Sequence, residues 1–125
     1  MRWFTLEETL LPIEEFNELL KNWEGKYIKV SKYEKNDHDE TFLKLNRVSY
    51  KKKSRRVDDY EPMHTLELNG SGKVRIAQDD YEPLPNSLYE IPLEDNSEYK
   101  FDGSRFSLNT DRGVYIIEIA PESAD

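Results

Sequence analysis

The spacing of apolar residues changes once along the chain, and this change limits the possible folds more than any other feature. Up to Trp23 the apolar residues recur every three or four positions, the period of a helix with one buried face. After Gly25 they alternate with polar residues, the period of a strand with one buried face. The sequence therefore predicts an α+β fold that is mainly β with an N-terminal helix, over about residues 5–24.

Pro12 divides the predicted helical segment. A proline lacks the backbone N–H, so it either kinks one long helix or opens a second helix at its first position. After Pro12, one apolar stripe is formed by Ile13, Phe16, Leu19, Leu20 and Trp23. We expect this stripe to pack on the strands and Gly25 to end the helix.

The β region covers about residues 26–120, and turn residues divide it into about seven or eight short strands. This regular spacing predicts an antiparallel meander that forms a small barrel or a highly curved sheet covered by the helix. The apolar parity changes between Leu45 and Val48, so we expect a bulge or bend near Asn46–Arg47. Residues 69–72, Asn-Gly-Ser-Gly, and the pair Asp102–Gly103 are predicted to be hairpin turns.

Four further segments have predicted places in this meander. The run Val114–Ile119 has the highest β propensity and is expected near the centre of the sheet. Pro92 cannot donate a hydrogen bond to a neighbour, which places the strand Leu88–Leu93 near an edge or makes Pro92 a strand end. Residues 35–40 are polar and are predicted to form a loop. Residues 121–125 are predicted to be a frayed tail.

We expect a single domain over residues 1–125, because this length buries one core and no long linker divides it. Cysteine is absent, which excludes disulfides and thiol chemistry. No stretch reaches the roughly 20 apolar residues of a membrane span. The N-terminal residues become acidic too early for a secretory signal. These features predict a soluble, cytoplasmic protein without membrane contact.

The net charge of −8 is unevenly distributed: −4 over residues 1–24, +5 over residues 25–78 and −9 over residues 79–125. An acidic protein repels phosphate backbones and attracts basic partners. Nucleic acid is therefore disfavoured as a partner, although Lys51–Arg56 forms a basic run. A basic protein is the favoured partner, and the sequence does not specify an oligomeric state.

The pentapeptide Asp-Asp-Tyr-Glu-Pro occurs twice, at residues 58–62 and again at residues 79–83. If the residues between the copies form one β-hairpin, both copies lie at its open end, and the turn at Asp102–Gly103 is expected at the same end. We call this predicted surface the acidic–aromatic rim. Its candidate binding residues are Asp58, Asp59, Tyr60, Glu61, Asp79, Asp80, Tyr81 and Glu82.

The repeated pentapeptide has three interpretations. In the first, the match is a coincidence, because Asp and Pro favour turns in any all-β domain. In the second, the tyrosines supply contact area and the acids attract a basic partner, which makes the protein a non-enzymatic protein-binding module. The third is a calcium site. The only calcium-loop candidate begins at Asp37 and has Phe42 where glycine is required, so no metal or cofactor is predicted.

No catalytic residue is predicted, because the chain lacks a Gly-x-Ser-x-Gly elbow and the glycine spacing of a phosphate loop. His64 shares the inward parity of Leu66 and is expected in the core or at the barrel mouth. Acid–base chemistry there would need Glu67 or Glu90 beside it. One alternative function remains open. Eight Tyr, five Phe and two Trp could line a barrel cavity, as in a small-molecule carrier or enzyme.

Overall fold

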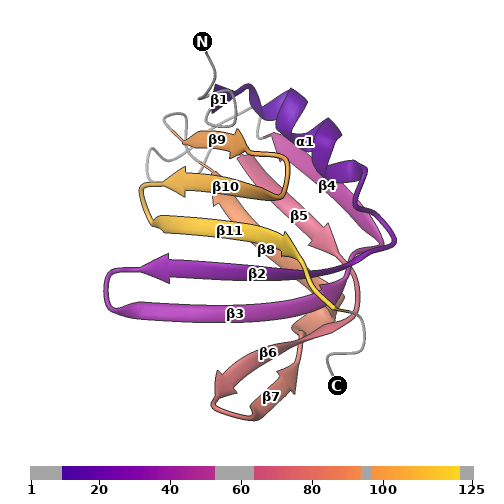
Figure 1. The fold of residues 1–125 in the computed structure, drawn as a ribbon, viewed down its shortest axis with the longest axis vertical. Coiled ribbons are helices and arrows are strands. Elements are labelled where there is room, and N and C mark those ends of the chain that lie inside the picture. The colour runs from indigo at the N-terminus through magenta and orange to yellow at the C-terminus, as the bar shows by residue number, and fades with distance from the viewer. Residues whose placement is uncertain (1–9, 53–63, 94–96, 122–125) are drawn as a thin grey trace.

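A computed structural model describes residues 10–52, 64–93 and 97–121 of the chain, and shows two antiparallel sheets with one short helix (Figure 1). The larger sheet has eight strands in the order β1-β9-β10-β11-β2-β3-β6-β7. These strands are β1 (Leu10–Leu11), β2 (Tyr27–Glu34), β3 (Asp37–Lys44), β6 (Gly72–Ala77), β7 (Asp80–Pro83), β9 (Glu98–Phe101), β10 (Arg105–Thr110) and β11 (Gly113–Ile119).

The smaller sheet has three strands in the order β4-β5-β8 and crosses behind the larger one in Figure 1. Its strands are β4 (Arg47–Lys52), β5 (His64–Asn69) and β8 (Leu88–Leu93). The helix is α1 (Ile13–Lys21), and a 3-10 helix, η2 (Pro85–Ser87), connects β7 to β8. The prediction of a mainly β fold with a helix and antiparallel strands is confirmed. The predicted small barrel fits only loosely, since the described strands form two sheets that do not close into a barrel.

A sharp corner connects the two sheets. Three pairs of strands continue into one another across it: β3 into β4, β5 into β6, and β7 into β8. Backbone hydrogen bonds run through the corner between neighbouring segments of the chain. They include Lys44 N–H to the Ser71 carbonyl at 3.0 Å and Gly70 N–H to the Ser87 carbonyl at 2.9 Å. The bend predicted near Asn46–Arg47 is therefore confirmed as part of this corner.

Two glycines allow the strands to approach closely at the corner. A Cβ atom at Gly70 would overlap the carbonyl oxygen of Lys44, and one at Gly72 would overlap the carbonyl oxygen of Phe42. The prediction that residues 69–72 form a hairpin turn is wrong, because β5 pairs with β4 and β8, whereas β6 pairs with β3 and β7. Asn-Gly sequences favour tight hairpins locally. Here Gly70 and Gly72 have no side chain, and this allows the chain to bend from one sheet into the other.

Of the two alternatives predicted for Pro12, one long kinked helix is wrong, and a helix that opens at the proline is nearly correct. Leu10–Leu11 is a strand that pairs with β9, and Pro12 is the extended residue that precedes α1. The apolar stripe is confirmed: Phe16 and Leu20 are fully buried. The ring of Phe16 lies edge-on to that of Phe106, with 5.0 Å between centroids.

The polar stretch at residues 35–40 is not a loop beyond its first two residues. Glu34 pairs directly with Asp37, so β2 and β3 form a hairpin with a two-residue turn, and Lys35 has a positive φ of 50°. The polarity of residues 37–40 reflects an exposed strand end rather than irregular backbone.

Other predicted strand positions are confirmed. Strand β8, which contains Pro92, lies at an edge of the smaller sheet, and β11 lies between β10 and β2 inside the larger sheet. The core fills the space between the two sheets and α1. Its largest fully buried side chains are Phe16, Leu20, Ile28, Leu43, Leu45, Leu66, Leu68, Ile91, Leu93, Phe106, Leu108 and Ile117.

Candidate functional site

The second copy of the pentapeptide forms a strand rather than a rim loop. Asp79 adopts a positive φ of 65° in the turn after β6, a conformation that Asp tolerates better than most residues. The remaining four residues, Asp80–Pro83, are strand β7, and all four are exposed. Strand β7 lies at one edge of the larger sheet, and β1 lies at the other (Figure 1).

Tyr81 is the centre of this exposed strand. It pairs with Arg75, so its side chain lies on the outer face of the larger sheet, the face turned away from the smaller sheet. Its ring lies 6.1 Å from that of Phe42 in an edge-on arrangement, and the Lys73 ammonium lies 4.7 Å from its centroid. Although 38 % exposed, Tyr81 is held between an aromatic ring and a cation.

The two carboxylates of β7 lie on the other side of the strand. Successive side chains of a strand point to opposite faces, so Asp80 and Glu82 share a side that Tyr81 does not. The sequence placed all these groups on one rim. The structure instead separates the acids from the aromatic ring across the thickness of the sheet.

A polar cavity of about 300 Å³ lies between β3 and the end of β6. It opens where the β3–β6 ladder ends at the pair Glu40–Arg75 and the pairing of β6 with β7 shifts register between Arg75 and Ala77. Its lining residues are His38, Asp39, Glu40, Arg75, Ile76, Ala77 and Gln78. Sequence reasoning missed this site because residues 37–40 were interpreted as a loop, although Phe42, Glu40 and His38 share one strand parity.

Glu40 contacts two basic side chains of this cavity, Arg75 and His38. One of its oxygens accepts a hydrogen bond from Arg75 Nη1 at 2.9 Å, and the other lies 3.7 Å from His38 Nε2. The hydrogen bond to Glu40 raises the pKa of Arg75, against a smaller opposing effect of burial. The His38 ring stacks on Tyr33 at 4.4 Å. Two of the charged groups that line the cavity, Glu40 and Arg75, therefore already interact with one another.

The predicted meeting of the two pentapeptides loses its geometric basis. It required β5 and β6 to form a hairpin, but these strands belong to different sheets and do not pair with each other. The first copy, with Asp58, Asp59, Tyr60 and Glu61, lies outside the described residues. The turn at Asp102 lies at the end of the sheet where β2 begins, since Arg105 pairs with Glu118 and Glu118 with Lys29. The Asp79 turn lies at the other end, so the prediction for Asp102 is wrong.

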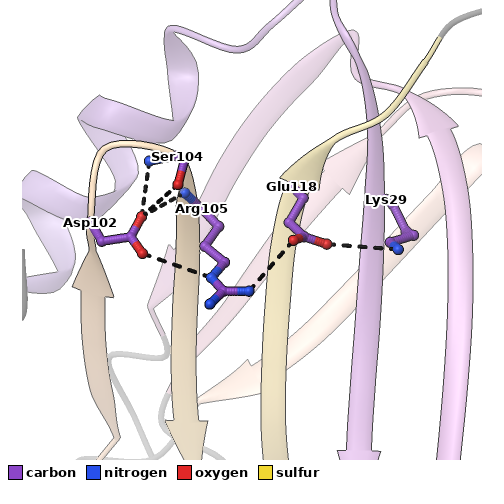
Figure 2. Close-up of polar contacts among 5 residues, drawn as sticks. All are labelled: Lys29, Asp102, Ser104, Arg105 and Glu118. Atoms are coloured by element: carbon purple, nitrogen blue, oxygen red, sulfur yellow. Dashed lines mark hydrogen bonds and ion pairs between the residues drawn. The ribbon is translucent and has the colours of Figure 1, made fainter.

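Asp102 has a structural role in its own turn, as Figure 2 shows. Its Oδ1 atom accepts hydrogen bonds from the backbone N–H groups of Ser104 at 2.9 Å and Arg105 at 3.0 Å. These two bonds lower the pKa of Asp102, and the Arg105 guanidinium adds to the effect. A chain of ion pairs then runs from Asp102 through Arg105 and Glu118 to Lys29, each separated by 3.7 Å.

His64 is buried on the inner face of the smaller sheet, as its parity predicted. Its Nδ1 atom is hydrogen-bonded to the Tyr50 hydroxyl, and its Nε2 atom has no partner in the described part of the chain. Glu67 and Glu90 occupy directly opposite positions on β5 and β8, and their side chains lie on the opposite face of the smaller sheet. Neither carboxylate therefore lies beside His64 on the face that the acid–base arrangement would need.

The aromatic residues predicted to line a barrel cavity instead include a packed cluster beneath α1. Trp23 lies edge-on to Phe106 at 4.7 Å, and Phe106 stacks on Phe101 at 4.2 Å. A second cavity, of about 180 Å³, is lined by Glu98, Lys100, Ser107, Asn109 and Val114. Both this cavity and the one beside Glu40 have mainly polar or charged linings, so neither supports a site for an apolar ligand.

The described residues bring no three His, Asp or Glu side chains together as metal ligands. Within the same ranges, no helix combines the length and apolar character that a membrane crossing requires.

Comparison with known proteins identifies the family but no established activity. The family described as YmzB-like protein matches residues 11–122. The chain is 34 % identical over 83 residues to the "uncharacterized protein YmzB" of Bacillus subtilis (strain 168), which covers 66 % of this chain and 69 % of that protein. No solved structure matches the chain significantly. Because the family match spans nearly the whole chain, the protein belongs to the YmzB-like family.

Proposed function

We propose that the protein is a non-enzymatic binding module that recognises another protein through β7 and the turn before it. The observation that carries this proposal is Tyr81, an exposed aromatic side chain held in place by Phe42 and Lys73. Tyrosine is enriched at binding hot spots because it offers a large contact area and loses little conformational freedom. A tyrosine already held by its neighbours loses less still.

The acidic side chains of β7 and of the turn before it favour a basic partner. Asp79, Asp80 and Glu82 are all exposed, and residues 79–125 carry a net charge of −9. Such a field accelerates the approach of a positively charged partner and repels an acidic one. Since Asp58, Asp59, Tyr60 and Glu61 repeat the same pattern, the proposal includes them as a second contact segment.

A pull-down from extracts of the cells that produce the protein tests this function. We expect Tyr81→Ala to lose the proteins that the unmodified chain retains. The combined variant Asp79→Asn, Asp80→Asn and Glu82→Gln should also lose these proteins, and the extent of this loss should depend on the salt concentration. Tyr33→Ala is the matched control, because Tyr33 is also exposed, at 47 %, but lies on β2. An unchanged set of retained proteins with both β7 variants, each still folded, would refute the proposal.

The first copy is tested separately. Asp58→Asn combined with Asp59→Asn should weaken retention if both pentapeptides contact the partner. Retention that depends only on β7 would limit the binding segment to residues 79–83.

A further inference from the structure

Strand β7 has a free edge, because no other described strand pairs with its outer side (Figure 1). The Leu84 N–H donates to the Gly72 carbonyl at 2.9 Å, which shows which residues face β6. Backbone groups alternate in direction along an antiparallel strand, so Glu82 also faces β6, whereas the N–H and C=O groups of Tyr81 face outward. Pro83 faces outward too and contributes only a carbonyl, as is usual for proline at a sheet edge.

The side chains of β7 discourage a second copy of the chain from pairing at this edge. Two β7 strands that paired antiparallel about Tyr81 would place Asp80 of each copy opposite Glu82 of the other. Like charges directly opposite one another destabilise a strand pair. Acidic residues on an exposed edge are a known protection against such self-association.

The same side chains favour a different strand. Asp80 and Glu82 lie on one side of β7, and Tyr81 lies on the other with Phe42 and Lys73. A strand with basic residues at every second position would place its cations beside both carboxylates. The residue between those cations would lie on the Tyr81 side, where an apolar side chain fits against the ring.

We propose that β7 binds its partner by strand addition, and that the partner supplies a short extended segment with alternating basic and apolar residues. This inference rests on the proposed function and specifies the partner's chemistry. The segment is short because Asp79 turns the chain at one end of β7 and the Leu84–Ser87 connection ends it at the other. Tyr81 is the only residue of β7 that offers both an outward donor and an outward acceptor.

A direct test uses the capped peptide Lys-Val-Lys-Val-Lys with the full-length, isotope-labelled protein. NMR should show binding at β7, and hydrogen exchange of the Tyr81 amide should slow when the peptide is present. The peptide Lys-Lys-Lys-Val-Val has the same composition without the alternation, and it should bind roughly tenfold more weakly. Equal binding of both peptides, or unchanged Tyr81 exchange, would overturn strand addition.

Backbone methylation of the peptide tests the hydrogen bonds themselves. Only one edge of the peptide faces β7. Two methylated peptides are therefore compared, one methylated at the valine amides and one at the lysine amides. Only one of the two should lose binding. Binding of both methylated peptides would show that side-chain charge alone holds the peptide. Slowed Tyr81 exchange in concentrated protein without peptide would show that a second copy occupies the edge, which would also overturn the proposal.

A charge exchange provides the matched variant. With Asp80→Lys and Glu82→Lys, the protein should reject the lysine peptide and bind Glu-Val-Glu-Val-Glu, a change of at least roughly tenfold in each affinity. Both positions are exposed, so folding should be retained. If Tyr81→Ala releases the cellular partner but no peptide binds β7, the proposed function stands and strand addition is wrong. If neither result appears, both are wrong.

Discussion

The outer face of the larger sheet has two halves that use charge differently. Over β10, β11 and β2, with the turn after β9, the ion pairs run unbroken from Asp102 through Arg105 and Glu118 to Lys29 (Figure 2). Two groups of each sign neutralise one another there. We call this region the paired half.

Over β3, β6 and β7, which we call the open half, the arrangement is less complete. Glu40 and Arg75 pair closely on the outer face, but the next strand, β7, exposes Tyr81 on this face and Asp80 and Glu82 on the opposite one. The cavity beside Glu40 and the register shift after Arg75 lie in the same region. The difference teaches that a charged surface is not a binding surface in general. Charges that neutralise one another across strands leave little for a partner, whereas an edge strand leaves both charge and backbone available.

The largest effect is expected from Gly72→Ala, which removes the corner that supports the open half. The added Cβ would overlap the backbone of β3, so unfolding free energy should fall by about 3 kcal/mol, as measured by chemical denaturation. Gly103→Ala in the paired half is the control. Its φ is +97° with no atom near the added Cβ, so it should cost only about 1 kcal/mol. Equal losses would show that the corner does not depend on close strand approach.

Glu40→Gln should be the more costly of two matched carboxylate changes. The Glu40 side chain is only 17 % exposed, and its hydrogen bond to Arg75 is short. Hydrogen bonds to charged groups contribute more than neutral ones, so the melting temperature should fall by about 4 °C in thermal denaturation.

Glu118→Gln makes the corresponding change in the paired half. The Glu118 side chain is 34 % exposed and both of its ion pairs are 3.7 Å long, so the melting temperature should fall by only about 1 °C. High salt should abolish the fall of about 1 °C caused by Glu118→Gln, because salt screens exposed ion pairs. A Glu118 effect as large as that of Glu40 would contradict the distinction between the two halves.

An effect between those of Glu40→Gln and Glu118→Gln concerns pH and Asp102. Its pKa is lowered in the folded protein, so the carboxylate stabilises the fold at pH values above its ordinary pKa of 3.8. That stabilisation is lost as pH falls through the folded value. Asp102→Asn should therefore melt about 2 °C below the unmodified protein at neutral pH, and the two melting temperatures should converge as pH falls from 3.8 through the lowered pKa of Asp102. A constant difference across this range would show that the charge of Asp102 does not contribute.

Most strands could be predicted because their signal is local. The alternation of Leu66 with Leu68, of Phe106 with Leu108, and the run from Val114 all mark strands in the structure. Burial on one face imposes a period of two wherever the partner strand lies, so this pattern needs no knowledge of pairing.

Errors arose where one local pattern fits two arrangements. Glycines at 70 and 72 favour a tight turn, yet they equally permit strands to approach at a corner. The polar residues at 37–40 resemble a loop, yet an exposed strand end has the same composition. In both cases the choice depends on a neighbouring strand distant in the sequence.

The candidate site shows the same limit. The repeat drew attention to residues 79–83, but it did not show that the acidic side chains and Tyr81 lie on opposite faces. That arrangement follows from β7 being a strand. No motif marked Glu40 and Arg75 as partners, because they are 35 positions apart and meet only through the register of β3 with β6.

The sequence by itself determined the class of fold, the inward face of the strands, the helical stripe and the uneven charge. These follow from the spacing of apolar and charged residues along the chain, which is a local property. Only the tertiary structure decided which strands pair, that the sheets meet at an open corner, and that β7 is left at an edge. Pairing depends on packing and hydrogen bonds between segments far apart in the chain, and several pairings satisfy the same alternation equally well.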